Sequence, residues 1–545
     1  MRYLNIILTG LIIFGPLGGL NIVAQVSLVK DISPGGTGSF NIESNPGIAY
    51  GEKYIFPAWS EGFGVELWIS DGTSSGTSLL KDINEGTGDS NPHLYFNAFG
   101  KIYFNAYSEI FGRELWVTDG TTEGTYQVMD IEPGAAGSNP EPGDIYKGYL
   151  YFAATSNADR EVWRLDSLST PQLFKDLNPT AQSRPREFKA ANGMLYFSAN
   201  FNPNNDPLID QDEPFVSDGT PEGTVHLELF VFDDDGSESR DYTPLGDYVF
   251  FLASLTGDTL NPDNTLMITE GDQFSTGEAF FSSVYWLMPV KDKMLFIDPT
   301  DLWLVEVSPS GWSAHAEGAY KNPLRDNEKK PSAYLNENLC LPVIDEDENI
   351  GVELYFSDGS DTWMSADINP GTASSDPWYI VSNGTKALFA ASSSDTNREL
   401  YESDGTSDGT KLVADLYPGE EGSDPIQLVV AGNNVFFYAK TPETGYELYK
   451  YELEPSSLAH PSTIAFDGKA YPQPAISGES VQILWNDRNH FDRAELTQAN
   501  GSVLQQYEII DGNQMTIETN HLSPGVYYLN LLGIDGNSVC KIIVQ

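Results

Sequence analysis

The sequence predicts an all-β protein: a β-propeller of about nine four-stranded units, with eight also compatible, followed by a small immunoglobulin-like β-sandwich. Three observations lead to this fold class. A repeat runs through most of the chain, each period contains four strand-like runs, and the incomplete repeats at the two ends of the array complete each other.

The repeat is clearest where Glu-Leu and an aromatic residue are followed by an Asp-Gly pair, as in the segments that begin at Glu66, Glu114, Glu353 and Glu399. The same position recurs along the chain at intervals of 36–52 residues. The nine equivalents are Glu66, Glu114, Glu161, Glu213, Thr265, Asp301, Glu353, Glu399 and Glu447. A period of about 40–50 residues is typical of propeller blades.

Within one period, the strand-like runs are His93–Asn97, Lys101–Phe104, Glu114–Thr118 and Tyr126–Asp130. Each run is short, rich in aromatic or β-branched residues and bounded by turn formers, which is the pattern of a strand. The second strand of most repeats is apolar on successive residues, as in Tyr54–Phe56. Such a strand is covered on both faces, as it is between stacked blades.

The two ends of the array predict that the ring closes on itself. An unpaired fourth strand, Leu28–Ile32, precedes the first full repeat, and a third strand without a fourth, Glu447–Tyr451, ends the last one. Joining the two would complete a blade and remove the exposed sheet edges.

The domain boundaries follow from changes in composition. Residues 1–24 are expected to be a secretory signal peptide, with Arg2, an apolar run from Tyr3 to Leu20 and a cleavage site after Ala24. A membrane anchor is the alternative, which the Gly and Pro residues within the run disfavour. Residues 25–453 form the repeat array, 454–470 a linker rich in Pro and Ser, and 471–545 a compact C-terminal domain.

Composition restricts the partners. With 29 Lys and Arg against 79 Asp and Glu, the formal charge is −50, which repels nucleic acid and anionic lipid and favours divalent cations. The two cysteines, Cys340 and Cys540, fall in different predicted domains, so no structural disulfide is expected. No later stretch reaches the roughly 18–20 apolar residues that span a bilayer.

Two resemblances cover nearly the whole chain. The repeats resemble the ELWxxDGT repeat family of secreted bacterial proteins, through Glu66–Thr73, Glu114–Thr121, Glu353–Gly359 and Glu399–Thr406. The C-terminal segment resembles the type A sorting domain of the type IX secretion system of Bacteroidetes. The residues that carry this second resemblance are Tyr471, Pro472, Pro474, Gly525, Tyr527 and Lys541, whereas Gln473 departs from the usual Asn. The resemblance implies export by the type IX machinery, removal of the domain, and release of the protein or its attachment to the outer surface.

The Asp-Gly turns are the first candidate functional feature. The equivalent aspartates are Asp71, Asp119, Asp218, Asp358 and Asp404. They would present repeated carboxylates on the ring, but an Asp that bonds the backbone of its own turn is the favoured interpretation. A catalytic site needs one special constellation, whereas a repeat supplies many equal ones.

Acidic clusters in the divergent repeats are candidate Ca²⁺ ligands, because Ca²⁺ prefers carboxylate oxygens in irregular loops. The residues concerned are Asp210, Asp212, Asp233, Asp235, Asp345 and Asp347. None of the clusters has the EF-hand pattern, and solvated acidic loops are the competing interpretation. No other cofactor is expected.

Motifs of catalysis are missing from the sequence. The six histidines are scattered singly, and no nucleophile elbow, phosphate loop or zinc motif occurs. We therefore expect a secreted or surface-displayed binding protein for adhesion or for capture of polysaccharide or protein. A hydrolase with carboxylates on loops of the divergent blades, and a structural surface-layer component, are the alternatives.

Overall fold

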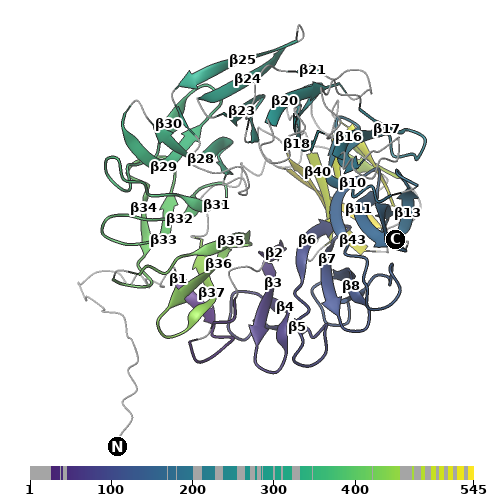
Figure 1. Cartoon of the computed structure of the whole chain (residues 1–545), viewed down its shortest axis with the longest axis horizontal. Helices are drawn as coiled ribbons and strands as arrows, with labels where there is room; N and C mark the ends of the chain where they lie inside the picture. The colour runs from purple at the N-terminus through teal and green to yellow at the C-terminus, as the bar shows by residue number, and fades with distance from the viewer. Residues whose placement is uncertain are drawn as a thin grey trace, which may run out of the picture.

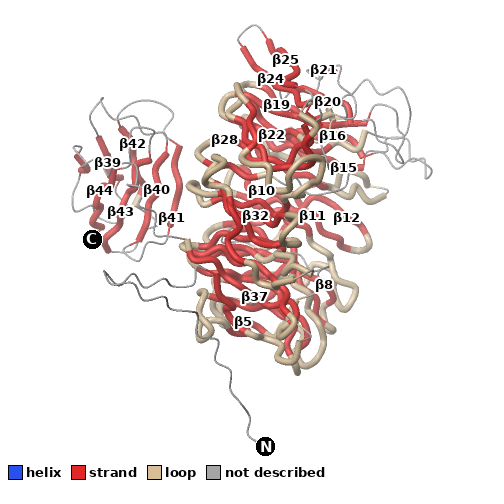
Figure 2. Tube along the Cα trace, turned by 90° about the vertical axis from the view of Figure 1, so that its left-hand side faces the viewer, coloured by secondary structure: helices blue, strands red, loops and turns tan. Residues whose placement is uncertain are grey.

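The computed structural model describes residues 26–453 and 469–544 with internal gaps. The gaps are 37, 41–45, 168–169, 180, 201–211, 228–236, 255–263, 271–276, 279–283, 285, 299–300, 309–310, 319, 322–331, 346–347, 420, 472–479, 485–492, 499–502, 509–513, 520–524 and 533–537. Over the described residues the regular elements are all strands, as Figure 2 shows, and no helix long and apolar enough to cross a membrane occurs among them.

Nine sheets follow one another around a ring (Figure 1). The first four are β2 (Ile48–Tyr50), β3 (Lys53–Ser60), β4 (Gly64–Ser70) and β5 (Ser78–Lys81); β6 (His93–Ala98), β7 (Lys101–Ser108), β8 (Gly112–Thr118) and β9 (Tyr126–Gln127); β10 (Glu141–Tyr146), β11 (Tyr149–Ser156), β12 (Asp159–Leu165) and β13 (Gln172–Lys175); and β14 (Arg186–Ala191), β15 (Met194–Asn200), β16 (Asp212–Ser217) and β17 (Thr224–His226).

The next four sheets are β18 (Arg240–Leu245), β19 (Tyr248–Ser254), β20 (Asn264–Thr269) and β21 (Gly277–Glu278); β22 (Leu287–Val290), β23 (Lys293–Ile297), β24 (Leu302–Ser308) and β25 (Gly311–Gly318); β26 (Tyr320–Lys321), β27 (Ala333–Leu335), β28 (Asn338–Asp345), β29 (Ile350–Ser357) and β30 (Thr362–Met364); and β31 (Trp378–Ser382), β32 (Ala387–Ala391), β33 (Glu399–Ser403) and β34 (Lys411–Ala414). The ninth joins β35 (Ile426–Ala431), β36 (Asn434–Thr441) and β37 (Gly445–Glu452) to β1 (Val26–Lys30).

Seven of the nine sheets are four-stranded antiparallel meanders. In the seventh sheet β26 and β27 both pair with β28, and the ninth sheet takes β1 from the N-terminal end of the array. The prediction of a propeller is therefore confirmed, with nine blades and not eight. The predicted closure is confirmed too. Strand β1 pairs antiparallel with β37, with Val26 opposite Tyr451 and Leu28 opposite Tyr449, and this ninth sheet is called the seam blade below.

The core lies between neighbouring blades. Ile55 and Leu67 of the first blade pack in one buried cluster with Ile102 and Phe104 of the second, and all four side chains are fully buried. Consecutive apolar residues in the second strands therefore face a neighbour on each side, as the sequence pattern predicts.

The C-terminal strands form two sheets around one core. The first contains β38 (Lys469–Tyr471), β39 (Ser480–Leu484) and β42 (Gln514–Glu518). The second contains β40 (Arg493–Gln498), β41 (Val503–Glu508), β43 (Gly525–Leu532) and β44 (Ser538–Val544). Buried Val481 and Ile517 of the first sheet share a cluster with Leu496 and Leu529 of the second, which is the packing of a β-sandwich.

Candidate functional site

The Asp-Gly turns are held by local hydrogen bonds. Oδ1 of Asp119 accepts bonds from the backbone N–H of Thr121 at 3.0 Å and from its hydroxyl at 2.7 Å. Asp71, Asp218 and Asp404 accept the same pair of bonds. Asp358 instead accepts two backbone N–H groups, those of Ser360 and Asp361.

The second glycine of this motif is required for a steric reason. A Cβ atom on Gly124 would lie 2.0 Å from Oδ1 of Asp119, and the glycines that follow Asp71, Asp218 and Asp404 at the same spacing are blocked in the same way. The carboxylate therefore occupies the space of a side chain inside its own turn. Hydrogen bonds hold the pKa of Asp71, Asp218, Asp358 and Asp404 below its usual value, so these carboxylates are ionised at neutral pH. These contacts favour a structural role for the five aspartates.

The glutamate that marks each repeat makes a second, longer-range contact. Oε1 and Oε2 of Glu66 accept the backbone N–H groups of Ile83, Asn84 and Ser90 and the hydroxyl of Ser90, at 2.7–3.2 Å. Glu66 is fully buried, and the loop that follows the fourth strand of its blade wraps around the carboxylate. We call this arrangement of a buried glutamate and a loop serine the clamp.

The clamp recurs in seven of the nine blades. The glutamate–serine pairs are Glu66–Ser90, Glu114–Ser138, Glu161–Ser183, Glu213–Ser237, Glu353–Ser375, Glu399–Ser423 and Glu447–Ser39. Burial raises the pKa of Glu66, Glu161 and Glu353 to about 7, because desolvation outweighs the hydrogen bonds that favour the ionised form.

Each clamp also joins two blades. The carbonyl oxygen of Ser90 accepts the backbone N–H of Tyr107, in the second strand of the next blade, at 2.8 Å. Ser39, held by Glu447 of the seam blade, likewise accepts the N–H of Trp59 in the first blade at 2.7 Å. The glutamates therefore fix the loops through which neighbouring blades are connected.

The fifth and sixth blades lack the glutamate. Thr265 occupies the position in β20, and Asp301 precedes β24 at the position in the sixth blade. There, Asp298 accepts bonds from the Asp301 N–H at 2.8 Å and from the Trp303 indole N–H at 2.9 Å. In the sixth blade a short local turn stands in place of the clamp.

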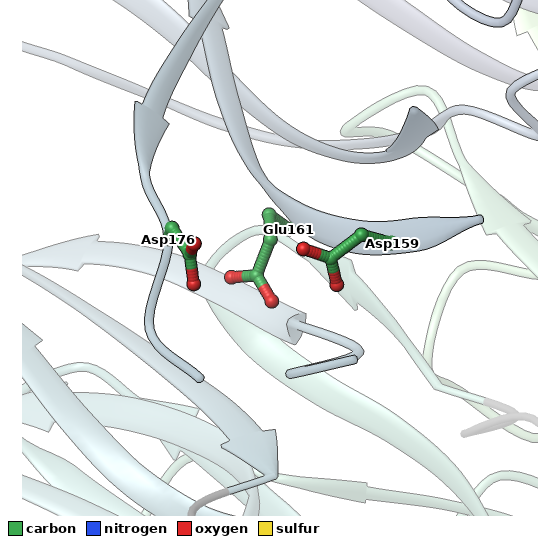
Figure 3. Close-up of side chains that lie close together, drawn as sticks. All are labelled: Asp159, Glu161 and Asp176. Carbon is green, nitrogen blue, oxygen red and sulfur yellow. The ribbon is translucent and has the colours of Figure 1, made fainter. Parts of the chain in front are cut away.

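Three carboxylates gather at the clamp of the third blade: Asp159 and Glu161 in β12 and Asp176 after β13 (Figure 3), with ligand atoms within 4.8 Å of one another. The oxygens of Glu161 accept the N–H groups of Leu177 and Ser183 and the hydroxyl of Ser183. One buried oxygen of Asp159 has no donor. Ca²⁺ binds about 6–8 oxygens, whereas the oxygens of Glu161 already accept hydrogen bonds from N–H and O–H groups. We therefore assign these three carboxylates to the clamp.

The acids predicted as Ca²⁺ ligands do not come together in the described part of the chain. Asp212 pairs with Arg186 at 2.7 Å, and Asp345 accepts the Glu348 N–H at 3.1 Å and the Tyr355 hydroxyl at 3.2 Å. Asp210, Asp233, Asp235 and Asp347 lie outside the described residues, so the Ca²⁺ hypothesis stays a prediction.

The first strands lie toward the centre of the ring (Figure 1), and in five blades they combine one backbone geometry with differing side chains. In five blades the residue after the first pairing position of this strand has a left-handed backbone with φ between 53° and 57°. These residues are Leu94, Glu187, Asp241, Tyr379 and Gln427. Such a conformation costs about 1–3 kcal/mol for a residue other than glycine. The strand register shifts at the same place each time.

Family comparison explains the C-terminal sandwich. Residues 469–545 match the family described as the secretion system C-terminal sorting domain. The chain ends in a type IX sorting domain. Among its predicted signal residues, Tyr471 lies in β38, Gly525 and the buried Tyr527 in β43, and Lys541 in β44, whereas Pro472 and Pro474 are outside the described residues. The sorting domain indicates export by the type IX machinery and a secreted or cell-surface protein.

The remaining comparisons concern the propeller. No curated protein matches the sequence. A puromycin hydrolase aligns with a TM-score of 0.36 and 13% identity over 64% of this chain and 58% of its own. AztD from Citrobacter koseri aligns with a TM-score of 0.30 and 10% identity over 87% and 96%, and the propeller domain of the Trilobed protease from Pyrococcus furiosus with 0.31 and 12% over 57% and 94%. The chain spans little more than half the length of the hydrolase.

Proposed function

We propose that the protein is a binding protein of the cell surface or the secreted fraction, used for adhesion or for the capture of polysaccharide or protein. Its repeats would belong to the ELWxxDGT family and its N-terminal 24 residues would be a signal peptide. The observation that carries the proposal is the contrast between repeated and varied positions around the ring.

The residues that repeat from blade to blade make contacts that stabilise the fold. The turn aspartates bond their own turns, and the clamp glutamates bond the loops between blades. The left-handed positions of the first strands hold an aliphatic, two acidic, one aromatic and one amide side chain on the same backbone. Leu94 and Glu187 are exposed and Asp241 is partly exposed, whereas Gln427 is buried and Tyr379 packs against core residues. A strained geometry that exposes a different side chain in the second, fourth and fifth blades supports a role of these positions in recognition.

The proposal is tested by incubating the mature propeller with immobilised polysaccharides and with surface proteins of neighbouring cells, measuring both retained protein and released product. Retention without product is the expected result. Steady release of product would instead support the carboxylate hydrolase, and assembly of the protein alone into sheets would support the surface-layer component.

A further inference from the structure

The strongest candidate for a ligand site is a cavity of about 440 Å³ on the first strands of three blades. Its lining comes from three consecutive first strands: Glu187 and Lys189 of β14, Asp241, Thr243 and Pro244 of β18, and Pro289 of β22. The cavity thus lies in the divergent blades, where the ring departs most from its repeat.

Two charged side chains of this lining are available. The side chain of Lys189 is exposed and makes no hydrogen bond or ion pair within the described residues, while its backbone pairs with Tyr196 in the sheet. Glu187 is exposed as well, and among the described residues its carboxylate accepts one long bond of 3.5 Å, from the backbone N–H of Asp241. One free cation and one nearly free carboxylate therefore border the same cavity.

Other residues fix the shape of the cavity. Oδ2 of Asp241 accepts the N–H of Leu287 at 2.8 Å, which ties β18 to the sixth blade. Glu187 and Asp241 both have the left-handed backbone, with φ of 57° and 56°. Tyr334 of β27 is bonded through its hydroxyl to the Pro289 carbonyl, and 43% of this residue is exposed. Tyr334 is not itself part of the lining, but its hydroxyl bond holds an exposed aromatic residue against Pro289, which is part of the lining.

The charges point to an uncharged, hydroxyl-rich ligand. A polyanion would meet Glu187 and Asp241 in a chain of charge −50, which disfavours an anionic ligand, and an ammonium ligand has no acceptor for the donor group of Lys189. A sugar hydroxyl can donate to a carboxylate and accept from an ammonium group at once, and both bonds are charge-assisted. An aromatic ring adds an apolar surface for the C–H face of a sugar.

We propose that this cavity binds a neutral sugar unit of a polysaccharide, with Glu187 accepting from one hydroxyl, Lys189 donating to another, and Tyr334 packing at the edge. The inference rests on the proposed binding function and names its site and its class of ligand.

The test compares the mature protein with Glu187→Gln and Lys189→Met on immobilised laminarin, xylan and amylose, with alginate as the anionic counterpart. Glu123→Gln and Lys440→Met are matched controls, because their side chains lie outside the cavity. All four replaced side chains belong to residues that are exposed or partly exposed, so the melting temperatures should equal that of the parent. Loss of one charge-assisted bond should weaken binding to the neutral polymer about tenfold or more.

Retention on a neutral polymer that falls in both cavity variants and in neither control is the expected result. Equal retention by all variants would refute the cavity and leave the binding function in place. Retention on alginate alone would refute the class of ligand. Retention on surface proteins with none on any polysaccharide would refute the sugar site without refuting the binding function. Sugar released into solution would refute binding without catalysis and support a hydrolase.

Discussion

Replacing Glu447 by alanine should open the seam blade. The carboxylate accepts the N–H groups of Ile32 and Ser33 at 3.1 and 3.0 Å and the hydroxyl of Ser39 at 2.6 Å, across more than 400 residues of sequence. Each buried donor left without an acceptor costs about 1–3 kcal/mol. Water that enters the space left by the side chain offsets part of this loss of stability. The variant also no longer has the cost of burying a carboxylate. We therefore expect a loss of about 3–5 kcal/mol, in the lower part of the roughly 3–9 kcal/mol that three unpaired donors would cost.

The assay is urea unfolding combined with amide hydrogen exchange. Glu114→Ala is the matched control, because its clamp has the three equivalent donors, with the Ser138 N–H in addition, but lies within a blade built from continuous chain. Both variants should lose stability, and only Glu447→Ala should expose the amides of β1, Val26–Lys30, to exchange. If β1 stayed as protected as in the parent, the clamp would not hold the ring closed and the reasoning would be wrong.

Four further predictions concern the whole molecule. The stabilisation from Glu66, Glu161 and Glu353 should be fully present below about pH 4.5, the ordinary pKa of a glutamate, and should be lost as the pH rises through about 7, since folding raises the pKa of these three groups. The turn aspartates, whose pKa folding lowers, lose their contribution only as the pH falls below about 3.8, so thermal stability should fall between about pH 4.5 and 7, and unfolding that is flat over this range would contradict it. Asp119→Ala should cost about 0.5–2 kcal/mol, as the loss of a side-chain cap does, and leave ligand retention intact; unchanged stability with lost retention would assign the turn to binding. Intact-mass analysis of secreted protein should show chains that begin near Gln25 and end between Leu453 and Tyr471, and a surface species that keeps both Met1 and Gln545 would refute this processing. Millimolar Ca²⁺ should raise the melting temperature more than Na⁺ of equal ionic strength, because cations relieve the repulsion of a −50 chain; identical curves would reduce the effect to screening.

Local features were predictable from the sequence. The bond from Asp119 to Thr121 spans two residues, so the motif itself indicates the turn, and consecutive apolar residues such as Ile102 and Tyr103 indicate a strand covered on both faces. The number of blades followed from the spacing of one position, even where Thr265 replaces the glutamate.

The clamp was not predicted, although its signal was present. In the sequence the glutamate marks the repeat, whereas the exposed aspartates are the residues that the turn motif indicates as functional candidates. A charged residue recurring in a strand covered on both faces must find buried partners, and Ser90 follows Glu66 by 24 residues. The cavity gave no signal, because nothing in the sequence shows that Glu187 or Asp241 has a left-handed backbone.

The position of β37 has a mechanical consequence for a protein held at the cell surface by its C-terminal end. Tension on that end would enter the ring at Leu453, whose N–H is bonded to the Asn433 carbonyl, and pass directly into β37. This strand lies inside its sheet, with a ladder to β36 on one side and to β1 on the other. The pulled strand must break both ladders and release Glu447 before it can leave, so the blade that joins the two ends of the ring is also the one that would bear the load of attachment.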